Sequence, residues 1–351
     1  SPGLYRLKNR DHKTLFVIGT EISCIYTQND KCRRIHLCLL MPDLESAEKL
    51  NSLLFDLGCN LKSDGRPIIG LSAKELAKLA WGANEKSFVF PAHAWTPWFS
   101  VFGSKSGFDS LSDCFGELSK KITAIETGLS SDPLMNRLVA DLDDVVLISN
   151  SDAHSLNNLG REANVFNLEK ISYEEIISVL SKKNNKNFLY TIEFFPEEGK
   201  YYFDGHADCD FCCEPKESLK LKKLCPRCGK QLVLGVLNRI NELSDRKISE
   251  AKNKNQFISI MPLQEIISFW LGINKKAKKV IQLYLSLVEK KSEFEILIDA
   301  KETELKQMMD QELVDLILAV RQGKVEKSPG FDGVYGKIII KSDFKNKIKS
   351  K

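Results

Sequence analysis

The chain has 351 residues, of which 43% are hydrophobic and 28% charged, and its formal net charge is +4. This length exceeds what one ordinary core needs and predicts two or three domains, and the composition is typical of a folded protein. No apolar run approaches the roughly 20 residues that cross a bilayer, and the polar start SPGLYRLKNR does not resemble a signal peptide. We therefore expect no membrane partner.

Charges and cysteines are unevenly distributed along the chain. Residues 244–351 contain 21 Lys and Arg against 15 Asp and Glu, which indicates either contact with a polyanion or a lysine-rich surface that is only solvated. Of the ten cysteines, five lie between Cys209 and Cys228. With no secretory signal, disulfides are not expected, and we predict a reducing, cytoplasmic location.

The first half alternates strand-like and helix-like segments. The runs TLFVIGTEIS, RIHLCLLMP, SFVFPAH, KITAIETG and DVVLISNSDAH are short and rich in β-branched and aromatic residues, as strands are. Residues 44–57 and 72–81 have helical spacing, and Ser72 with Glu75 forms a capping box. Such alternation predicts a parallel α/β sheet or barrel.

The second half changes in character. A helix is predicted over 172–182, a polar linker over 184–187, and then a short β-rich region that carries the cysteines. Helices are predicted over 262–271, 277–295 and 302–321, and SPGFDGVYGKIII is typical of a turn followed by a strand. We therefore predict a barrel domain over 1–185, a zinc module over 186–243 and a helical, basic, DNA-binding region over 244–351.

Several predicted strands place a metal-type side chain at or just after their end. In an α/β barrel these ends form one active-site face, so side chains from distant positions would converge there. Carboxylates and imidazoles suit clusters of Zn, Mn or Fe, which can serve phosphoryl displacement. The candidate ligands are Glu21, His93, Glu126, Asp152 and His154, together with His36 near the start of its run.

Each of these residues also has a plainer interpretation. His36 would suit an apolar core, and His93 could simply pack in its aromatic loop. Glu21 and Glu126 could cap helices at strand ends. The D-x-H spacing of SDAH is the most specific signal, because at a strand end it puts both side chains on one face.

Further features indicate contacts with DNA. The loop after His93 is rich in aromatic residues, which could stack on bases beside a lysine or pack the rim of the barrel. The cluster KKAKK at 275–279 would suit backbone phosphates, or form a solvated helix start. The candidate contacts are Trp98, Lys105, Arg66, Arg161, Lys275 and Lys276.

The clustered cysteines have the spacing of a structural zinc site. Cys209, Cys212, Cys225 and Cys228 form C-x2-C-x12-C-x2-C, and four thiolates close a tetrahedron with no open position. Cys213 remains an alternative to Cys212 as the second ligand. His206 could be an extra ligand or a base-pocket contact, although a structural role is the simpler interpretation.

Longer strings point to a known family. The D-x-H strand end and the spaced histidines resemble the PHP (polymerase and histidinol phosphatase) domain. More narrowly, GRPIIGLSAKEL, PAHAWTPWFSVFGSKSGFDS, AIETGLSSDP, ISNSDAHSLNNLGREANVF, CPRCGKQLVLGVLNRINELSDR and PGFDGVYGKI resemble the endonuclease Q group of archaea and bacteria. The likeness runs over nearly the whole chain.

This resemblance implies a distorted β/α barrel with a trinuclear metal site, followed by a zinc module and a helical region. It implies a DNA repair endonuclease that uses metal-activated hydroxide to nick double-stranded DNA 5′ to deaminated bases, such as hypoxanthine and uracil, and at abasic sites. The implied cofactors are Zn²⁺ in the four-cysteine site and catalytic Zn²⁺, Mn²⁺ or Mg²⁺. Carried over by motif, the metal ligands are Glu21, His36, His93, Glu126, Asp152 and His154, of which Glu21, Asp152 and His154 act in catalysis.

One departure affects the expected activity. PHP domains begin with an H-x-H strand motif and a further acidic ligand, and neither precedes Glu21. We therefore expect an N-terminally truncated sequence with an incomplete metal set. Two rival functions remain, namely a PHP phosphomonoesterase acting on a small metabolite and a non-catalytic, zinc-containing DNA-binding protein.

Overall fold

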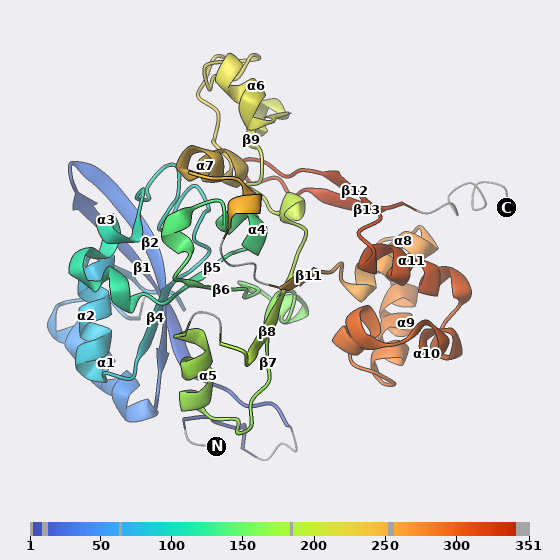
Figure 1. Cartoon of the computed structure of the whole chain (residues 1–351), viewed down its shortest axis with the longest axis horizontal. Helices are drawn as coiled ribbons and strands as arrows, with labels where there is room; N and C mark the ends of the chain where they lie inside the picture. The colour runs from blue at the N-terminus through green and yellow to red at the C-terminus, as the bar shows by residue number, and fades with distance from the viewer. Residues whose placement is uncertain (1–2, 9–12, 63–64, 183–184, 252–255, 342–351) are drawn as a thin grey trace.

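The computed structural model describes residues 3–8, 13–62, 65–182, 185–251 and 256–341. Figure 1 shows a body of sheets flanked by α1 (Leu44–Asp56), α2 (Ala73–Ala83) and α3 (Leu111–Phe115) at one end. The helices α8–α11, which lie within residues 263–321, gather at the opposite end, and α6 (Pro215–Lys220) projects from the top of the view. Within the described residues, no helix is both long and apolar enough to span a bilayer.

The first sheet is built on a long antiparallel hairpin. Its strands β1 (Ile18–Gln28) and β2 (Lys31–Met41) are joined by Asn29 and Asp30, which both have positive φ, as a tight two-residue hairpin turn requires. β3 (Ile68–Ile69) pairs parallel to β1, and β4 (Phe88–Pro91) pairs antiparallel to β2. The prediction of parallel strands was wrong here, because the first two strands are joined by a tight turn rather than by a helix.

The main core fills the space between this sheet and its helices. Fully buried residues such as Leu37 and Leu39 on β2 pack with Leu54 of α1 and Leu76 of α2. The Ser72–Glu75 capping box that opens α2 is confirmed. α7 (Val236–Leu243) also contributes to this core, through residues such as Ile240. A helix from the predicted zinc module therefore packs on the predicted barrel segment.

Two smaller sheets continue the body. β5 (Ala124–Glu126) and β6 (Val146–Ile148) pair in parallel, with the short α4 (Pro133–Asn136) between them. β8 (Phe188–Glu193) lies between β7 (Ala163–Phe166) and β11 (Phe257–Ser259), and α5 (Tyr173–Leu180) connects β7 to β8. This sheet contains one strand from each of the three predicted domains.

The C-terminal helices form a second core. α8 (Leu263–Leu271), α9 (Lys278–Val288), α10 (Glu302–Met308) and α11 (Gln311–Arg321) pack together with a π-helical turn at Glu295–Asp299. The single helix predicted over 302–321 is two helices, because the backbone is extended at Met309 and Asp310. The hairpin of β12 (Val325–Ser328) and β13 (Lys337–Ile340) follows.

The cysteine-rich segment is small and has little core. β9 (Asp204–His206) and β10 (Phe211–Cys213) form its only strand pair among the described residues, and α6 follows. The fold is thus mixed α/β with a helical C-terminal region, as predicted. The predicted barrel is not confirmed, since no sheet closes among the described strands, which fall into separate sheets.

Candidate metal centre

The β1–β2 hairpin brings the first two candidate ligands together. Glu21 lies opposite Cys38, and His36 lies opposite Ser23. Opposed residues share a face, as do residues two apart on a strand, so Glu21 and His36 are diagonal neighbours. His36 Nδ1 lies 2.6 Å from Glu21 Oε1. The antiparallel pairing explains how His36 reaches this site from near the start of its run.

His93 completes a compact group. It follows β4, whose Pro91 pairs with Leu37, so its side chain lies beside His36. His93 Nε2 lies 3.1 Å from His36 Nδ1 and 3.6 Å from Glu21 Oε1. The φ of His93 is 27°, in the left-handed region that non-glycine residues rarely adopt. Such backbone strain is typical of functional sites.

Glu126 lies directly behind this group at the end of β5. Its Oε1 accepts a hydrogen bond from the backbone N–H of His93 at 3.0 Å, and its Oε2 accepts one from Asn150 Nδ2 at 2.9 Å. Asn164 Nδ2 in turn donates to Asn150 Oδ1 at 3.1 Å. The carboxylate is 3% exposed. Its orientation is therefore fixed from two sides, while each oxygen retains a lone pair.

The electrostatic balance of the site is acidic. Burial alone would lower the pKa of His93, but Glu21, Glu126 and Asp152 outweigh burial and raise it. Burial would raise the pKa of Glu21, yet hydrogen bonds from His36 and His93 hold that pKa far below its ordinary value. Burial raises the pKa of Glu126. Three carboxylates around two imidazoles create a potential that attracts cations.

The D-x-H pair lies at the rim of the site. Asp152 has a φ of 44°, and its charge reaches both His93 and Glu126. His154 Nδ1 lies 2.8 Å from the backbone oxygen of Asp152, and its side chain is 71% exposed. In the described part of the chain, neither residue belongs to the tight ligand group. Their role as metal ligands stays a prediction.

The donor set fits a divalent metal ion. Ligand atoms of Glu21, His36 and His93 all lie within 4.8 Å of one another, and one carboxylate with two imidazoles is a donor set that Zn and Mn accept. Arg66 Nη1 lies 3.3 Å from Glu21 Oε1, which places a cation at the same edge. The sequence predicted Arg66 as a phosphate contact, and its position beside the candidate ligands is compatible with that role.

Most of the aromatic loop after His93 packs inside the protein. Trp95 is 1% exposed and donates from Nε1 to Asn136 Oδ1 at 2.7 Å. The ring of Phe99 lies 4.7 Å from that of His36. Both predicted DNA contacts of this loop are accessible, since Trp98 is half-buried against Tyr201 and Lys105 is exposed.

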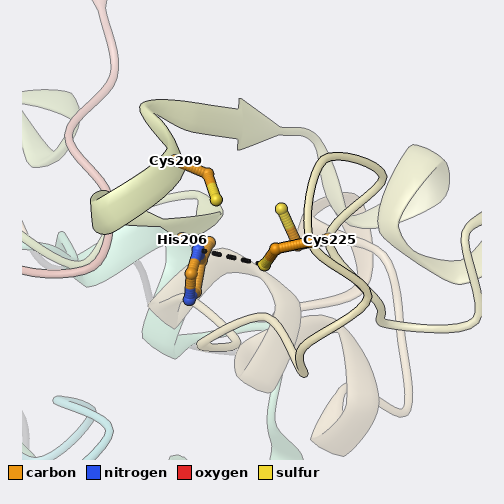
Figure 2. Close-up of side chains that lie close together, drawn as sticks. His206, Cys209 and Cys225 are labelled. Carbon is orange, nitrogen blue, oxygen red and sulfur yellow. Dashed lines mark hydrogen bonds between the residues drawn. The ribbon is translucent and has the colours of Figure 1, made fainter.

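A second group of metal-type side chains lies in the cysteine-rich segment. His206, Cys209, Cys225 and Cys228 have ligand atoms within 4.8 Å of one another, and Figure 2 shows His206, Cys209 and Cys225 turned toward a common point. Cys228 Sγ lies 3.8 Å from His206 Nδ1. Three thiols and one imidazole form a Cys₃His set, which is a common structural zinc site.

This group differs from the predicted four cysteines at one position. β9 and β10 pair with Phe211 opposite His206 and Cys212 opposite Gly205. Because side chains alternate along a strand, Cys212 points to the face opposite His206. The prediction placed Cys212 in the site from spacing alone, and the structure places His206 there instead. Cys213, the alternative, is buried in the small core with Cys225 and Leu232.

Sequence reasoning missed two residues near the metal centre. Asn150, in SNSDAH, holds Glu126, and no local pattern distinguishes it from other polar loop residues. Glu193 ends β8 and could have been found, since it is a strand-end carboxylate like Glu126. It is fully buried and accepts hydrogen bonds from Thr191 Oγ1 at 2.6 Å and Ser149 Oγ at 3.1 Å.

The chain is similar in sequence to one family model and to two longer proteins. Residues 262–324 match the family model of the MJ0043 C-terminal domain. Protein MJ0043 of Methanocaldococcus jannaschii is 34% identical over 257 residues, which cover 71% of this chain and 32% of MJ0043. The chain thus spans about a third of that relative. YqxK of Bacillus subtilis is 29% identical over 336 residues, covering 94% of this chain and 79% of YqxK.

Solved structures match over the full length. The crystal structure of the lesion-specific endonuclease PfuEndoQ from Pyrococcus furiosus has a TM-score of 0.84 at 27% identity, covering 100% of this chain and 84% of that one. The chain is thus similar over its whole length to endonuclease Q. An endonuclease Q complex with a 27-mer duplex carrying an abasic lesion at the active site also has a TM-score of 0.84, at 28% identity, covering 98% and 82%.

The similarity to endonuclease Q structures agrees with the two groups of side chains described above. The Cys₃His group falls in the segment predicted to bind zinc, although its fourth member differs from the predicted one. The ranges 1–185, 186–243 and 244–351 remain predicted domain boundaries.

Proposed function

We propose that this chain is a metal-dependent endodeoxyribonuclease that hydrolyses the phosphodiester 5′ to deaminated bases, such as hypoxanthine and uracil, and at abasic sites in duplex DNA. The carrying observation is the compact ligand group of Glu21, His36 and His93, with Glu126 fixed behind it. The full-length likeness to lesion-specific endonucleases supports the substrate class.

The predicted ligands would hold divalent metal ions at this acidic site. The residues are Glu21, His36, His93 and Glu126, joined at the rim by Asp152 and His154. When bound, Zn²⁺, Mn²⁺ or Mg²⁺ would act as Lewis acids toward the scissile phosphate.

Protein side chains around the ligands would position the substrate. Asn150 holds Glu126 through its amide, and Asn164 holds Asn150, so the ligand carboxylate cannot rotate freely. Arg66 beside Glu21 offers a guanidinium to a phosphate oxygen. Trp98 and Lys105, on the accessible part of the aromatic loop, would contact the strand.

The other two segments would hold the duplex. We assign the range 186–243 to a zinc module that stabilises a small core through the Cys₃His group. The helical region over 244–351 would contact backbone phosphates through the exposed Lys275 and Lys276.

A cleavage assay tests this function. The purified chain, supplied with Mn²⁺, Mg²⁺ or Zn²⁺, is incubated with labelled duplexes that carry one hypoxanthine, one uracil, one abasic site or no lesion. Nicks on the 5′ side of each lesion, absent in a Glu126→Gln variant, are expected. A chain that instead hydrolyses p-nitrophenyl phosphate and leaves all duplexes intact would be a phosphomonoesterase. Lesion binding without any hydrolysis would indicate a DNA-binding protein.

A further inference from the structure

Two side-chain hydroxyls lie against the imidazole of His93, at the ring nitrogen Nδ1. Ser100 Oγ is 3.1 Å and Thr96 Oγ1 is 3.2 Å from His93 Nδ1. The other ring nitrogen, Nε2, lies 3.6 Å from Glu21 Oε1 and so faces the candidate metal centre. Ser100 is fully buried. The hydroxyls of Thr96 and Ser100, here called the hydroxyl pair, therefore contact a candidate metal ligand at the nitrogen that is available for support.

The hydroxyl pair is surrounded by more acceptors than it has protons. Ser100 Oγ lies 2.6 Å from the backbone oxygen of His93, and Thr96 Oγ1 lies 2.9 Å from that of Trp98. The two hydroxyl oxygens also contact each other. Each hydroxyl has one proton to donate, so two protons already face three acceptors among the described residues. An unprotonated His93 Nδ1 would add a fourth acceptor, whereas an Nδ1–H group would add the missing donor.

The contacts of His93 Nε2 lead to the same assignment. His36 Nδ1 lies 2.6 Å from Glu21 Oε1. The pKa of Glu21 is far below its ordinary value, so its carboxylate is ionised and can only accept, and His36 Nδ1 carries the proton. The same nitrogen of His36 lies 3.1 Å from His93 Nε2. Two N–H groups that point at each other are unfavourable, so Nε2 is the unprotonated nitrogen when His93 is neutral.

The loop that carries the hydroxyl pair also holds the second imidazole. Phe99, between the two hydroxyl residues, has a φ of 62°, in the left-handed region that bulky side chains rarely adopt. Its backbone oxygen accepts a hydrogen bond from the N–H of His36 at 3.0 Å. A strained conformation of this kind persists only where the surrounding structure fixes it. The loop is therefore a defined support for both imidazoles.

We propose that the hydroxyls of Thr96 and Ser100 position His93 for metal binding, by keeping the proton of the neutral ring on Nδ1 and presenting the unprotonated Nε2 to a divalent metal ion. This inference rests on the metal centre of the proposed function and not on its substrate. An imidazole binds a metal ion through an unprotonated nitrogen, and the hydrogen bond made by its other nitrogen sets the tautomer and the orientation of the ring. In this chain the acceptors of that bond are hydroxyls, whose own protons are directed to backbone carbonyls of the same loop.

Nuclear magnetic resonance tests the proton assignment directly. Protein labelled with ¹⁵N-histidine and loaded with Zn²⁺ is measured in long-range ¹H–¹⁵N spectra, and a His93→Gln variant identifies the signals of His93. We expect a proton on Nδ1 that exchanges slowly with water, and no proton on Nε2. In a Thr96→Val/Ser100→Ala double variant the Nδ1 proton should lose its protection and exchange rapidly, because both of its acceptors are gone.

Calorimetric titration with Mn²⁺ measures the consequence for metal binding. The double variant should bind Mn²⁺ about 10- to 100-fold more weakly, which is the usual effect of removing the support of a ligand histidine. Thr96→Ser keeps the hydroxyl and should bind as tightly as the unmodified chain. Ser104→Ala is the matched control, because Ser104 lies in the same loop but donates to the backbone oxygen of Leu234 at 3.0 Å.

A His93 proton on Nε2, or equal Mn²⁺ affinity of the double variant and the unmodified chain, would overturn the inference, provided that circular dichroism shows folded variants. If the double variant does not fold, Thr96→Val alone must weaken Mn²⁺ binding while Thr96→Ser does not. Weaker Mn²⁺ binding by the double variant, combined with an unmodified chain that cuts none of the lesion duplexes, would refute the proposed nuclease function and leave the role of the hydroxyl pair standing.

Discussion

Replacing His206 with alanine should release zinc from the cysteine-rich segment, whereas replacing Cys212 with serine should not. His206 shares a group with three thiols, while the β9–β10 register directs Cys212 to the opposite face. Structural sites bind Zn²⁺ with a free energy of about 10–16 kcal/mol, which is roughly 3 kcal/mol for each of four ligands. At about 1.4 kcal/mol per tenfold change, His206→Ala should weaken zinc binding by roughly 100-fold.

The assay is a competition for zinc between each variant and a colorimetric chelator, with metal content measured by plasma mass spectrometry. His206→Cys should restore zinc, since it supplies a fourth thiolate at the same position. Loss of zinc in Cys212→Ser, with full retention in His206→Ala, would refute the reasoning and favour the four-cysteine prediction. Circular dichroism controls for variants that unfold for other reasons.

Three further predictions concern single side chains. Asp204→Ala should lower the free energy of unfolding by about 3 kcal/mol in urea titrations. Asp204 is fully buried, and its loss leaves the Gly235 N–H and the Asn238 amide without their acceptor. A change below about 1 kcal/mol would contradict this prediction. The raised pKa of Glu198 stabilises the folded state fully below about pH 4.5, and this contribution is lost as the pH rises through about 8. The free energy of unfolding should therefore be lower at pH 8.5 than at pH 5, and Glu198→Gln should make this difference smaller. An equal difference in both proteins would count against the prediction. Asn150→Ala should weaken metal binding at the candidate metal centre by about 10- to 100-fold in calorimetric titration, as removing the support of a ligand does, and an unchanged affinity would argue against this.

The local parts of the fold could be predicted from the sequence. Hydrophobic runs and caps depend on neighbouring residues, so the predicted helix at 44–57 corresponds to α1 and that at 172–182 to α5. The same locality identified Glu21, His36 and His93, since each lies on or directly after an apolar strand. Candidate ligands that lie on or directly after an apolar strand can therefore be identified from the sequence alone.

Pairing could not be predicted in the same way. The Asn29–Asp30 turn makes β1 and β2 antiparallel, and a pattern of alternating elements does not contain that information. The prediction of Cys212 as a ligand in place of His206 failed for the same reason. The spacing of cysteines in the sequence does not depend on strand register, but the direction of each side chain does. The cavity that Leu129, Arg161, Glu198, Lys275 and Tyr335 line depends on five distant segments meeting, which no local signal specifies.

The sheet of β7, β8 and β11 has a mechanical consequence for the protein. β8 is hydrogen-bonded on both sides, to β7 from the N-terminal body and to β11, which leads directly into the C-terminal helices. A fragment cut at residue 185 or 243 would lose a strand and leave an open edge prone to self-association. Tension applied to the helices would also be transmitted along β11 to β8, which ends at Glu193, and Glu193 accepts a hydrogen bond from Thr127, the residue after the candidate ligand Glu126.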